Sequence, residues 1–222
     1  EEFGKVIAIE PYLQTVVIGG GALKAVGGAQ AAAHIPGIIS GESIIAFAYA
    51  EPQGRYDLAN IRTTAKADGS GYVLNGHKGV VYCAPWATHL LVTARTGGST
   101  RERNGVELFL IDANLPGITR RASDSLGVRG LGCMDLTFDD VRIEGSTRLG
   151  ELGRGFSMGM RALEGGRIAI AAQALGIGRA ALDQAIAYAK EREVFGQPIS
   201  EFQAVQFQLA DIATDLAAAR ML

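Results

Sequence analysis

Residues 47–57, Phe-Ala-Tyr-Ala-Glu-Pro-Gln-Gly-Arg-Tyr-Asp, stand where a helical beginning gives way to a run of strands. The apolar half, extended back to Ile44, alternates as a buried strand does. We expect this strand to end at Glu51-Pro52, because proline has no amide hydrogen for the next ladder bond. A turn through Gly54 follows. On these residues alone, a plain strand and loop is as good an interpretation as a ligand-binding segment.

The composition excludes several classes of protein. The 222 residues include 21 basic and 23 acidic side chains, without the concentrated basic patch that nucleic acid or an anionic membrane surface favours. No apolar run approaches the roughly 20 residues of a membrane span, and the acidic start, Glu1-Glu2, is unlike a secretory signal. Cys83 and Cys133 lie far apart, which indicates neither a metal site nor a disulfide framework. A cytoplasmic, reducing location fits this pattern.

The first 43 residues are predicted to be helical. Apolar side chains recur on roughly one face of residues 11–26, and Gly27-Gly28 is a stop signal. An alanine-rich helical segment follows, which we expect Pro36 to close. Two short helices are a small unit to bury a face of their own, so we expect further residues upstream of this chain.

Residues 44–149 carry the signals of an antiparallel barrel or sandwich. The alternating residues 61–66 predict a hairpin through the turn at 68–71. Asn75-Gly76 is a second hairpin signal, which would place residues 79–82 on a new strand. We expect further strands at residues 90–94, 106–111 and 136–143, with loops at 97–105 and 114–117.

Beyond Gly150 the hydrophobic period changes from two residues to about 3.6. We expect one helix ending near Arg192, on the order of 55 Å long at roughly 1.5 Å per residue. Its apolar face is predicted from side chains that recur every three or four residues: Phe156, Met160, Leu163, Ile170, Ala174, Ile177, Ala181, Ala185 and Tyr188. Phe195-Gly196 breaks this helix, and Ser200 with Gln203 has capping-box spacing for a second one. Two such helices are half of a four-helix bundle, and their alanine-rich faces predict self-association as a dimer of dimers.

The opening segment resembles the flavin-binding segment of the acyl-CoA dehydrogenases, an aromatic residue and spacers followed by Thr-Glu-Pro-Gly-Ala-Gly-Ser-Asp. Phe47, Glu51, Pro52 and Asp57 match it. Further blocks match in the family's order: Tyr72-Val-Leu-Asn-Gly-His-Lys78, Leu90-Leu-Val-Thr-Ala-Arg-Thr96, Gly127-Val-Arg-Gly130, Phe138-Asp-Asp-Val141, Gly150-Glu-Leu-Gly-Arg-Gly-Phe156 and Arg192-Glu-Val-Phe-Gly-Gln-Pro-Ile-Ser-Glu-Phe-Gln203. The resemblance therefore runs through nearly the whole chain.

The resemblance implies an α+β fold in three segments. Residues 1–43 would be the end of an N-terminal helical domain, and residues 44–149 the middle domain, a central antiparallel β-barrel. Residues 150–222 would be the first two long helices of a C-terminal four-helix bundle, which tetramerises in the family. The chain thus resembles the middle of that architecture with both ends cut.

The resemblance also implies FAD as the cofactor, with its flavin in a groove between residues 47–56 and 80–82. The implied contacts in these segments are Phe47, Tyr49, Ala50, Glu51, Tyr56, Val80, Val81 and Tyr82. Some side chains depart from the family: its flavin-side threonine is Ala50 here, and its Trp-Ile-Thr is Val80-Val-Tyr82. The missing hydroxyl removes a hydrogen bond worth about 0.5–1.5 kcal/mol. Tyr56 and Tyr82 either restore hydroxyls from new directions or fill the cavity.

Arg192, Phe195 and Gln203 match the family's contacts to the FAD of a neighbouring subunit, and the planar fork of an arginine suits a pyrophosphate. The alternatives are that Arg192 only complements a helix C-terminus and that Gln203 only caps the next helix. Glu164 and Arg167, with Tyr56, stand where the family contacts the substrate. Arg167 is equally a candidate for a surface ion pair.

Most of the family carries its catalytic base near the C-terminus, beyond Leu222. A minority carry it directly before the arginine that matches Arg167, where this chain has Gly166. Glu164 is the nearest carboxylate, but two residues rotate it about 200° around the helix. We therefore expect Glu164 to contact CoA or an interface, and this segment alone not to turn over acyl-CoA.

The function implied by the resemblance is that of a FAD-dependent acyl-CoA dehydrogenase of fatty-acid or lipid metabolism. Such an oxidoreductase removes an α proton from the thioester while the β hydrogen leaves as hydride to flavin N5. Two alternatives stay open: a flavin-poor, non-catalytic partner subunit of a heteromeric dehydrogenase, or an acyl-CoA oxidase or flavin monooxygenase on the same fold. The implied partners are acyl-CoA, an electron-transfer acceptor, and either other copies of the chain or a paralogous subunit.

Overall fold

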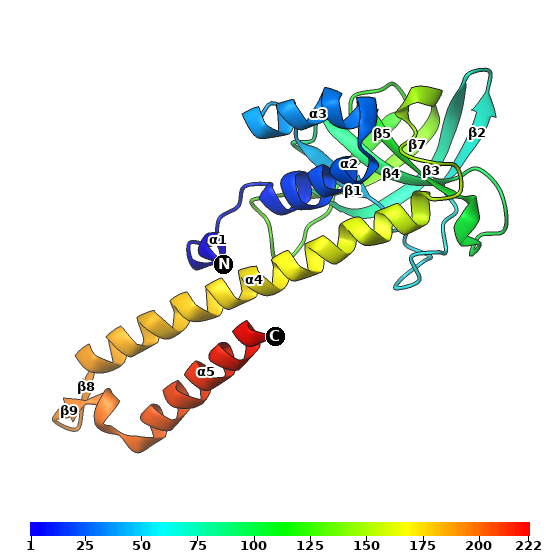
Figure 1. Cartoon of the computed structure of the whole chain (residues 1–222). Coiled ribbons are helices and arrows are strands. Elements are labelled where there is room, and N and C mark those ends of the chain that lie inside the picture. Colours follow the sequence, from blue (N-terminus) through cyan, green and yellow to red (C-terminus); the bar gives the residue numbers. More distant parts are fainter. The chain divides into compact units, whose positions relative to one another are not determined.

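The computed structural model describes all 222 residues. Its contacts divide the chain into two compact units, Ile9–Gly166 and a smaller unit made of Glu1–Ala8 with Arg167–Leu222. The larger unit holds a curled sheet with helices, and the smaller unit is mainly helical (Figure 1). The predicted α+β composition is confirmed, whereas domain boundaries at residues 43 and 149 stay a prediction.

Helices precede the sheet in the larger unit, as predicted. A π-helix, η1 (Tyr12–Gly20), continues directly into α2 (Gly21–Val26). Gly27 ends this continuous helical stretch with a φ of 67°, a conformation that costs glycine little.

The next helix, α3 (Gly28–Ser40), is longer than predicted, because Pro36 lies inside it instead of closing it. Proline cannot donate to the carbonyl of Ala32, but both residues are exposed and water can satisfy that oxygen. The helix ends only at Gly41, whose φ of 82° is the left-handed conformation common at helix C-termini.

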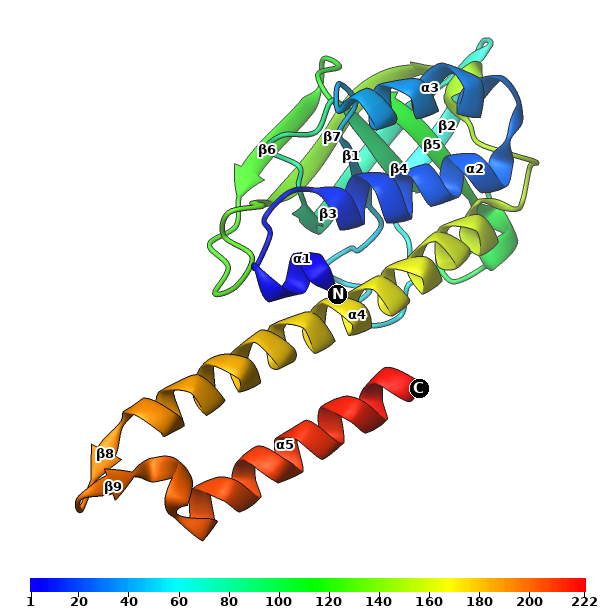
Figure 2. The same cartoon turned by 60° about the vertical axis from the view of Figure 1, so that its left-hand side comes forward.

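Seven strands form one curled sheet (Figures 1 and 2). They are β1 (Ile45–Ala48), β2 (Thr64–Asp68), β3 (Gly71–Tyr82), β4 (His89–Arg95), β5 (Val106–Asp112), β6 (Ile118–Ala122) and β7 (Cys133–Glu144). Their order is β1-β4-β2-β3-β7-β6, and β5 also pairs with β4. The long pairings are antiparallel as predicted, but β1 runs parallel to β4, with Phe47 opposite Leu91. Short 3₁₀ turns, η2 (Arg103–Gly105) and η3 (Gly145–Thr147), precede β5 and follow β7.

The predicted hairpin at Asn75-Gly76 is wrong, because β3 runs straight through both residues. The side chain of Asn75 instead accepts a bond from the Asp140 amide at 3.0 Å and donates to the Asp140 carboxylate at 2.9 Å, across to β7. Gly76 sits at a β-bulge, where a Cβ would lie 2.6 Å from the Cα of Thr63. This glycine therefore serves a close backbone approach and not a turn.

The larger unit has two apolar clusters. One lies within the curled sheet and includes Phe109, Leu136 and Phe138, all almost fully buried. The other, which includes Leu23 and Leu91, joins the sheet to η1, α2 and the beginning of α4 (Gly155–Glu191). Each fully buried Leu or Phe stabilises the fold by about 1.5–3 kcal/mol, so these clusters fix the strands that carry the candidate site.

α4 is the single long helix that the change of period predicts, with 37 residues. Its first turns lie in the larger unit, where glycines allow a close approach to the sheet. A Cβ on Gly155 would overlap the backbone of Glu107 and Leu108, and one on Gly159 would lie 3.3 Å from Cζ of Phe47. The start of α4 is thus seated directly on β1 and β5.

In the smaller unit a tight hairpin follows α4. β8 (Glu193–Val194) pairs with β9 (Gln197–Pro198) through Phe195 and Gly196, whose φ values of 54° and 77° suit a primed turn. A 3₁₀ turn, η4 (Ile199–Glu201), leads to α5 (Gln203–Met221). The predicted capping box is wrong: α5 begins at Gln203 itself, its N-cap is Phe202, and no side chain caps it.

The predicted apolar face of α4 is not the face that packs inside the smaller unit. Ile170, Ile177 and Tyr188 are 51%, 41% and 59% exposed, whereas Gly176 and Ala189 are buried. At Gly176 a Cβ would overlap the backbone of Glu1 at the start of α1 (Glu2–Lys5). Small residues let backbones approach closely, so a prediction from large side chains misses this stripe.

Candidate functional site

Residues 47–56 and 80–82, which the resemblance predicts beside a flavin, come from neighbouring parts of the structure. The Gly79 amide donates to the Ala50 carbonyl at 3.0 Å, which joins the chain after β1 to the middle of β3. The pairing of β3 with β7 shifts register between Lys78 and Val81, so Gly79 and Val80 leave the regular ladder. Val80 has a φ of 55°, and its amide donates to Oδ1 of Asp135 at 3.2 Å. This bulge turns Val80 outward, with 53% of it exposed.

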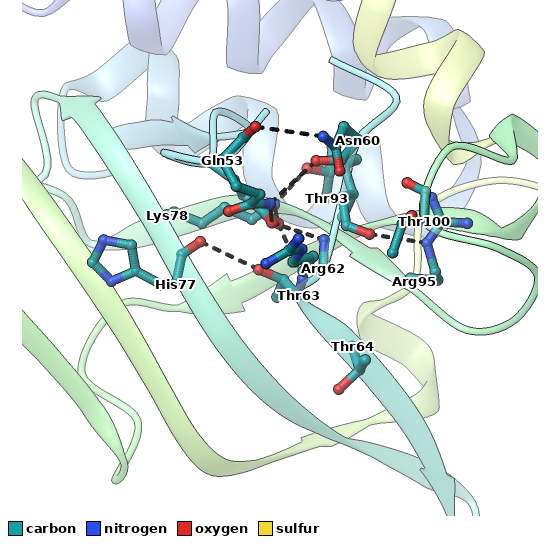
Figure 3. A network of polar contacts seen from close by, with 12 residues as sticks. Gln53, Asn60, Arg62, Thr63, Thr64, His77, Lys78, Thr93, Arg95 and Thr100 are labelled. Atoms are coloured by element: carbon teal, nitrogen blue, oxygen red, sulfur yellow. Dashed lines mark hydrogen bonds and ion pairs between the residues drawn. The ribbon is translucent and has the colours of Figure 1, made fainter. Parts of the chain in front are cut away.

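Lys78 and Glu51, the chain neighbours of Gly79 and Ala50, form a buried ion pair. Figure 3 shows Lys78 in the polar network that includes Thr63 and Thr93. Nζ of Lys78, on β3, donates to Oε1 of Glu51 at 2.7 Å and to Oγ1 of Thr93 at 3.0 Å. The Glu51 carboxylate also accepts from the Thr63 amide at 3.1 Å and the Arg62 amide at 2.8 Å. Lys78 is completely buried and Glu51 is 6% exposed.

Burial and pairing act against each other on both charges. Burial lowers the pKa of Lys78 to about 8, although Glu51 counteracts this by favouring the ammonium. Burial would raise the pKa of Glu51, but Lys78 and the bonds from Thr63 and Arg62 hold that pKa below its ordinary value of 4.5. Both groups are therefore charged at neutral pH, and neither has a free face for a ligand.

The structure separates the predicted flavin contacts into inward and outward side chains. Phe47 and Val81 are 5% and 0% exposed, so their side chains belong to the core. Tyr49 packs its ring 5.0 Å from that of Phe47. Tyr82 is half-buried at the end of β3, whereas Tyr56 is fully exposed. Backbone groups, Val80 and the tyrosines are thus the parts of these segments that a ligand can reach.

The predicted contacts to a neighbouring subunit's FAD all lie in the smaller unit. Arg192 follows α4 and is exposed, and its amide donates to the Tyr188 carbonyl at 2.9 Å. Phe195 is 93% exposed at the tip of the β8–β9 hairpin. Gln203 opens α5 with an exposed side chain. The three residues therefore surround one connection between helices, with polar and aromatic groups free for a partner.

An open hollow of about 370 Å³ lies beside the first turns of α4 in the larger unit. Its lining includes the guanidinium-bearing residues Arg103, Arg154 and Arg161, with Glu164 as a predicted member of the site. The guanidinium of Arg103 lies 5.2 Å from the centre of the Phe156 ring. The sequence reasoning missed Arg103 and Arg161. Arg167, predicted beside Glu164, is exposed and belongs to the smaller unit.

Two buried side chains hold the loops around this hollow. Arg95 donates to five carbonyls, which include those of Ile61, Thr100 and Glu102. Glu107, fully buried on β5, accepts from the Gly153 amide at 2.6 Å. Its other oxygen has no hydrogen-bond partner and lies 3.9 Å from the guanidinium of Arg148. Burial raises the pKa of Glu107, although Gly153 and Arg148 counteract that rise.

Comparisons with known proteins agree with this architecture. The profile of the acyl-CoA dehydrogenase middle domain matches residues 46–141, and that of the acyl-CoA dehydrogenase C-terminal domain matches residues 153–222. The mitochondrial short-chain specific acyl-CoA dehydrogenase of Bos taurus is 44% identical over 184 residues, which are 82% of this chain and 44% of that protein. The chain therefore belongs to the acyl-CoA dehydrogenase family.

Solved structures of acyl-CoA dehydrogenases match the chain as well. The butyryl-CoA dehydrogenase from Megasphaera elsdenii matches with a TM-score of 0.88 and 35% identity, over 92% of this chain and 54% of that one. A glutaryl-CoA dehydrogenase from Mycobacterium smegmatis, solved in complex with FADH2, matches with a TM-score of 0.85 and 30% identity, over 92% of this chain and 52% of that one. The chain spans about half the length of the curated relatives it matches.

No helix has both the length and the apolar character that crossing a bilayer requires. No group of three or more His, Cys, Asp or Glu side chains is placed to hold a metal ion.

Proposed function

We propose that this chain supplies the flavin-facing middle part of a FAD-dependent acyl-CoA dehydrogenase, which desaturates an acyl-CoA thioester between its α and β carbons. The observation that carries the proposal is the junction of residues 50–52 with residues 79–80, made by the Gly79 amide and the Ala50 carbonyl. It joins the two segments that the resemblance places beside the flavin, and the ion pair of Glu51 with Lys78, 27 residues apart along the chain, lies next to it.

The accessible groups at the junction suit a flat, largely apolar ring. Val80 and Tyr56 present exposed side chains, and the buried cation between β3 and the chain after β1, Lys78, is already paired with Glu51. Such a surface favours an uncharged ring system over a phosphate. Bound there, the flavin would supply the hydride acceptor. The backbone around Ala50 and Gly79 would orient the ring, and the packed core behind it, from Phe47 to Val81, would exclude water.

The hollow beside α4 suits the anionic part of a CoA thioester. Arg103, Arg154 and Arg161 bring three guanidinium groups to its lining, against one carboxylate from Glu164. Planar guanidinium groups bind phosphate oxygens through paired hydrogen bonds. Arg95 and Glu107 would act indirectly, by holding the loops that carry Arg103 and Arg154.

The catalytic base is proposed to lie outside this chain. Gly166, at the family's alternative position for the base, faces the core, since a Cβ there would lie 3.1 Å from Cδ1 of Ile18. Glu164 is among the residues that line the hollow and is assigned to substrate or interface contacts. Arg192, Phe195 and Gln203 are assigned to the FAD of a second copy, within a homotetramer that is a dimer of dimers. The reduced flavin would pass its electrons to an electron-transfer protein.

A second candidate is a non-catalytic partner subunit in a heteromeric dehydrogenase that keeps the fold and loses flavin. The observations that favour it are the side chains at the junction: Ala50 has no hydroxyl, and Tyr56 is fully exposed and contacts no core.

Purification of the intact protein separates the two candidates. The proposed enzyme is yellow, releases FAD on denaturation and binds acyl-CoA, and changing Arg161 to Gln weakens acyl-CoA binding about tenfold without changing FAD content. A colourless protein that takes up no added FAD would favour the partner subunit.

A further inference from the structure

The Glu51 carboxylate ties together parts of the chain that are distant in sequence. Its oxygens accept from Lys78 on β3, from the backbone amides of Arg62 and Thr63 before β2, and from the Gln53 side chain at 2.5 Å within its own loop. The loop between residues 51 and 63 is therefore fastened at its beginning and at its end to one group. Only Lys78 connects that group to the strand that carries Gly79 and Val80.

A buried ion pair is not needed to hold such a sheet together. Replacing a buried pair by apolar side chains of similar volume is often neutral or stabilising, because removing two charges from water is costly. Apolar residues are fully buried on the strands that carry Lys78 and its partner Thr93, namely Val81 on β3 and Leu91 on β4. The pair gives something that apolar packing lacks, namely a fixed position for the Glu51 carboxylate and for the two amides that it holds.

We infer that Lys78 is a positioning residue for the flavin: through Glu51 it holds the loop after β1 in register with the Gly79–Val80 bulge. The inference rests on the proposed function, because it concerns the same junction. Lys78 has no free face for the flavin and does not touch it. Its effect on the flavin site passes through one backbone bond. The Ala50 carbonyl accepts from the Gly79 amide, where Ala50 directly precedes Glu51 and Gly79 directly follows Lys78.

The test compares three variants of the intact protein by FAD dissociation constant, visible absorption and circular dichroism of the bound flavin, and melting temperature. The main variant is the double substitution Lys78→Met with Glu51→Leu, which keeps the volume and removes both charges. We expect its melting temperature to stay within about 4 °C of the wild type. We expect FAD to bind about tenfold or more weakly, with an altered flavin dichroism, because the loop is no longer fixed.

Thr93→Val is the matched control. It removes the other bond of the Lys78 ammonium, at 3.0 Å, without touching the loop, and valine keeps the shape of threonine. We expect FAD affinity and flavin dichroism to stay at the wild-type values.

Glu51→Gln is the conservative variant, which keeps one acceptor for the Thr63 or Arg62 amide. We expect its loss of FAD affinity to lie between the losses of the other two variants.

Each outcome decides the inference. A double variant that binds FAD as the wild type does would overturn it, as would a Thr93→Val variant that loses FAD equally. If the double variant does not fold, Glu51→Gln carries the test, and failure of that variant to fold would assign the pair to the fold itself and overturn the inference. A wild-type protein without FAD would refute the proposed function instead, which keeps the two failures distinct.

Discussion

Arg95 holds the loop that carries Arg103, and replacing it should lower the stability of the protein by an amount that the structure sets. Arg95 is 6% exposed, and its guanidinium donates to the carbonyls of Ala59 and Ile61 on one side and of Gly97, Thr100 and Glu102 on the other. This side chain thus links the loop that carries Arg103 to residues 59–61, beside a backbone bond from the Ile61 amide to the Thr100 carbonyl at 3.0 Å. Arg95→Met would keep the apolar stem and remove every donor.

The magnitude follows from which carbonyls can reach water afterwards. The loop at residues 97–102 is exposed, so its three carbonyls can bond to water instead. Ala59 and Ile61 are 8% and 2% exposed. The Ala59 carbonyl still accepts from the Ile61 amide at 2.9 Å, so only the Ile61 carbonyl would be left buried without a partner. At about 1–3 kcal/mol for one unsatisfied buried group, the substitution should cost about 1–3 kcal/mol of unfolding free energy. That is a substantial part of a typical total of about 5–15 kcal/mol.

Urea unfolding followed by circular dichroism measures this loss, and hydrogen exchange of residues 97–105 reports the loop. Arg95→Lys is the control, because its ammonium can reach fewer carbonyls at once and should cost less than the methionine. We expect faster exchange throughout the loop in Arg95→Met. A methionine variant within about 1 kcal/mol of the wild type, with unchanged exchange, would refute the assignment of Arg95 as the anchor of this loop.

Three further predictions concern other parts of the chain. Gly155→Ala should destabilise the protein by about 1–3 kcal/mol in urea unfolding, because the new methyl group would overlap the backbone of Glu107. This overlap outweighs the better helix propensity of alanine. An unchanged urea midpoint would count against the close packing of α4 on β5. The raised pKa of Glu107 means that the folded state keeps a proton which the unfolded state releases near pH 4.5, so stability falls as pH rises from 4.5 through the folded pKa. Glu107→Gln should lose that part of the fall in urea midpoints, and an identical pH profile would contradict it. Arg192→Ala in the intact protein should weaken FAD binding by about 1.5–3 kcal/mol in a fluorescence titration, and unchanged affinity would leave Arg192 as a helix-end residue only.

Elements with a strong period could be predicted from the sequence, and elements decided by distant contacts could not. The long helix α4 and the strands at residues 90–94 and 106–111 follow from local patterns. β6 was missed, because it is an edge strand whose sequence, Ile-Thr-Arg-Arg-Ala at residues 118–122, does not alternate apolar and polar residues. The Asn75-Gly76 signal misled, because Asn75 bonds to Asp140, 65 residues away, and no local pattern contains that contact.

The candidate site likewise has parts that the sequence predicts and parts that depend on contacts between distant residues. The resemblance implies two flavin-side segments, which stay a prediction, but it did not show that Lys78 and two backbone amides occupy the Glu51 carboxylate. The matching block that ends at Lys78 gave no role to this lysine, since a lysine in a half-exposed strand normally points to solvent. Arg103 and Arg161 line one hollow only because α4 packs closely against the sheet. That close packing depends on glycines, which no charge pattern in the sequence indicates.

Anaerobic addition of an acyl-CoA to the intact, flavin-loaded protein tests the central claim most directly. The account predicts a yellow protein whose visible flavin absorption bleaches on mixing, since the substrate's β hydrogen passes to the flavin held at the junction of residues 50–52 and 79–80. A short-chain, a long-chain and a branched acyl-CoA should each be mixed, and one of them should bleach it. A protein that holds FAD and stays yellow with all three would contradict the dehydrogenase assignment, and one that holds no FAD would contradict the site itself.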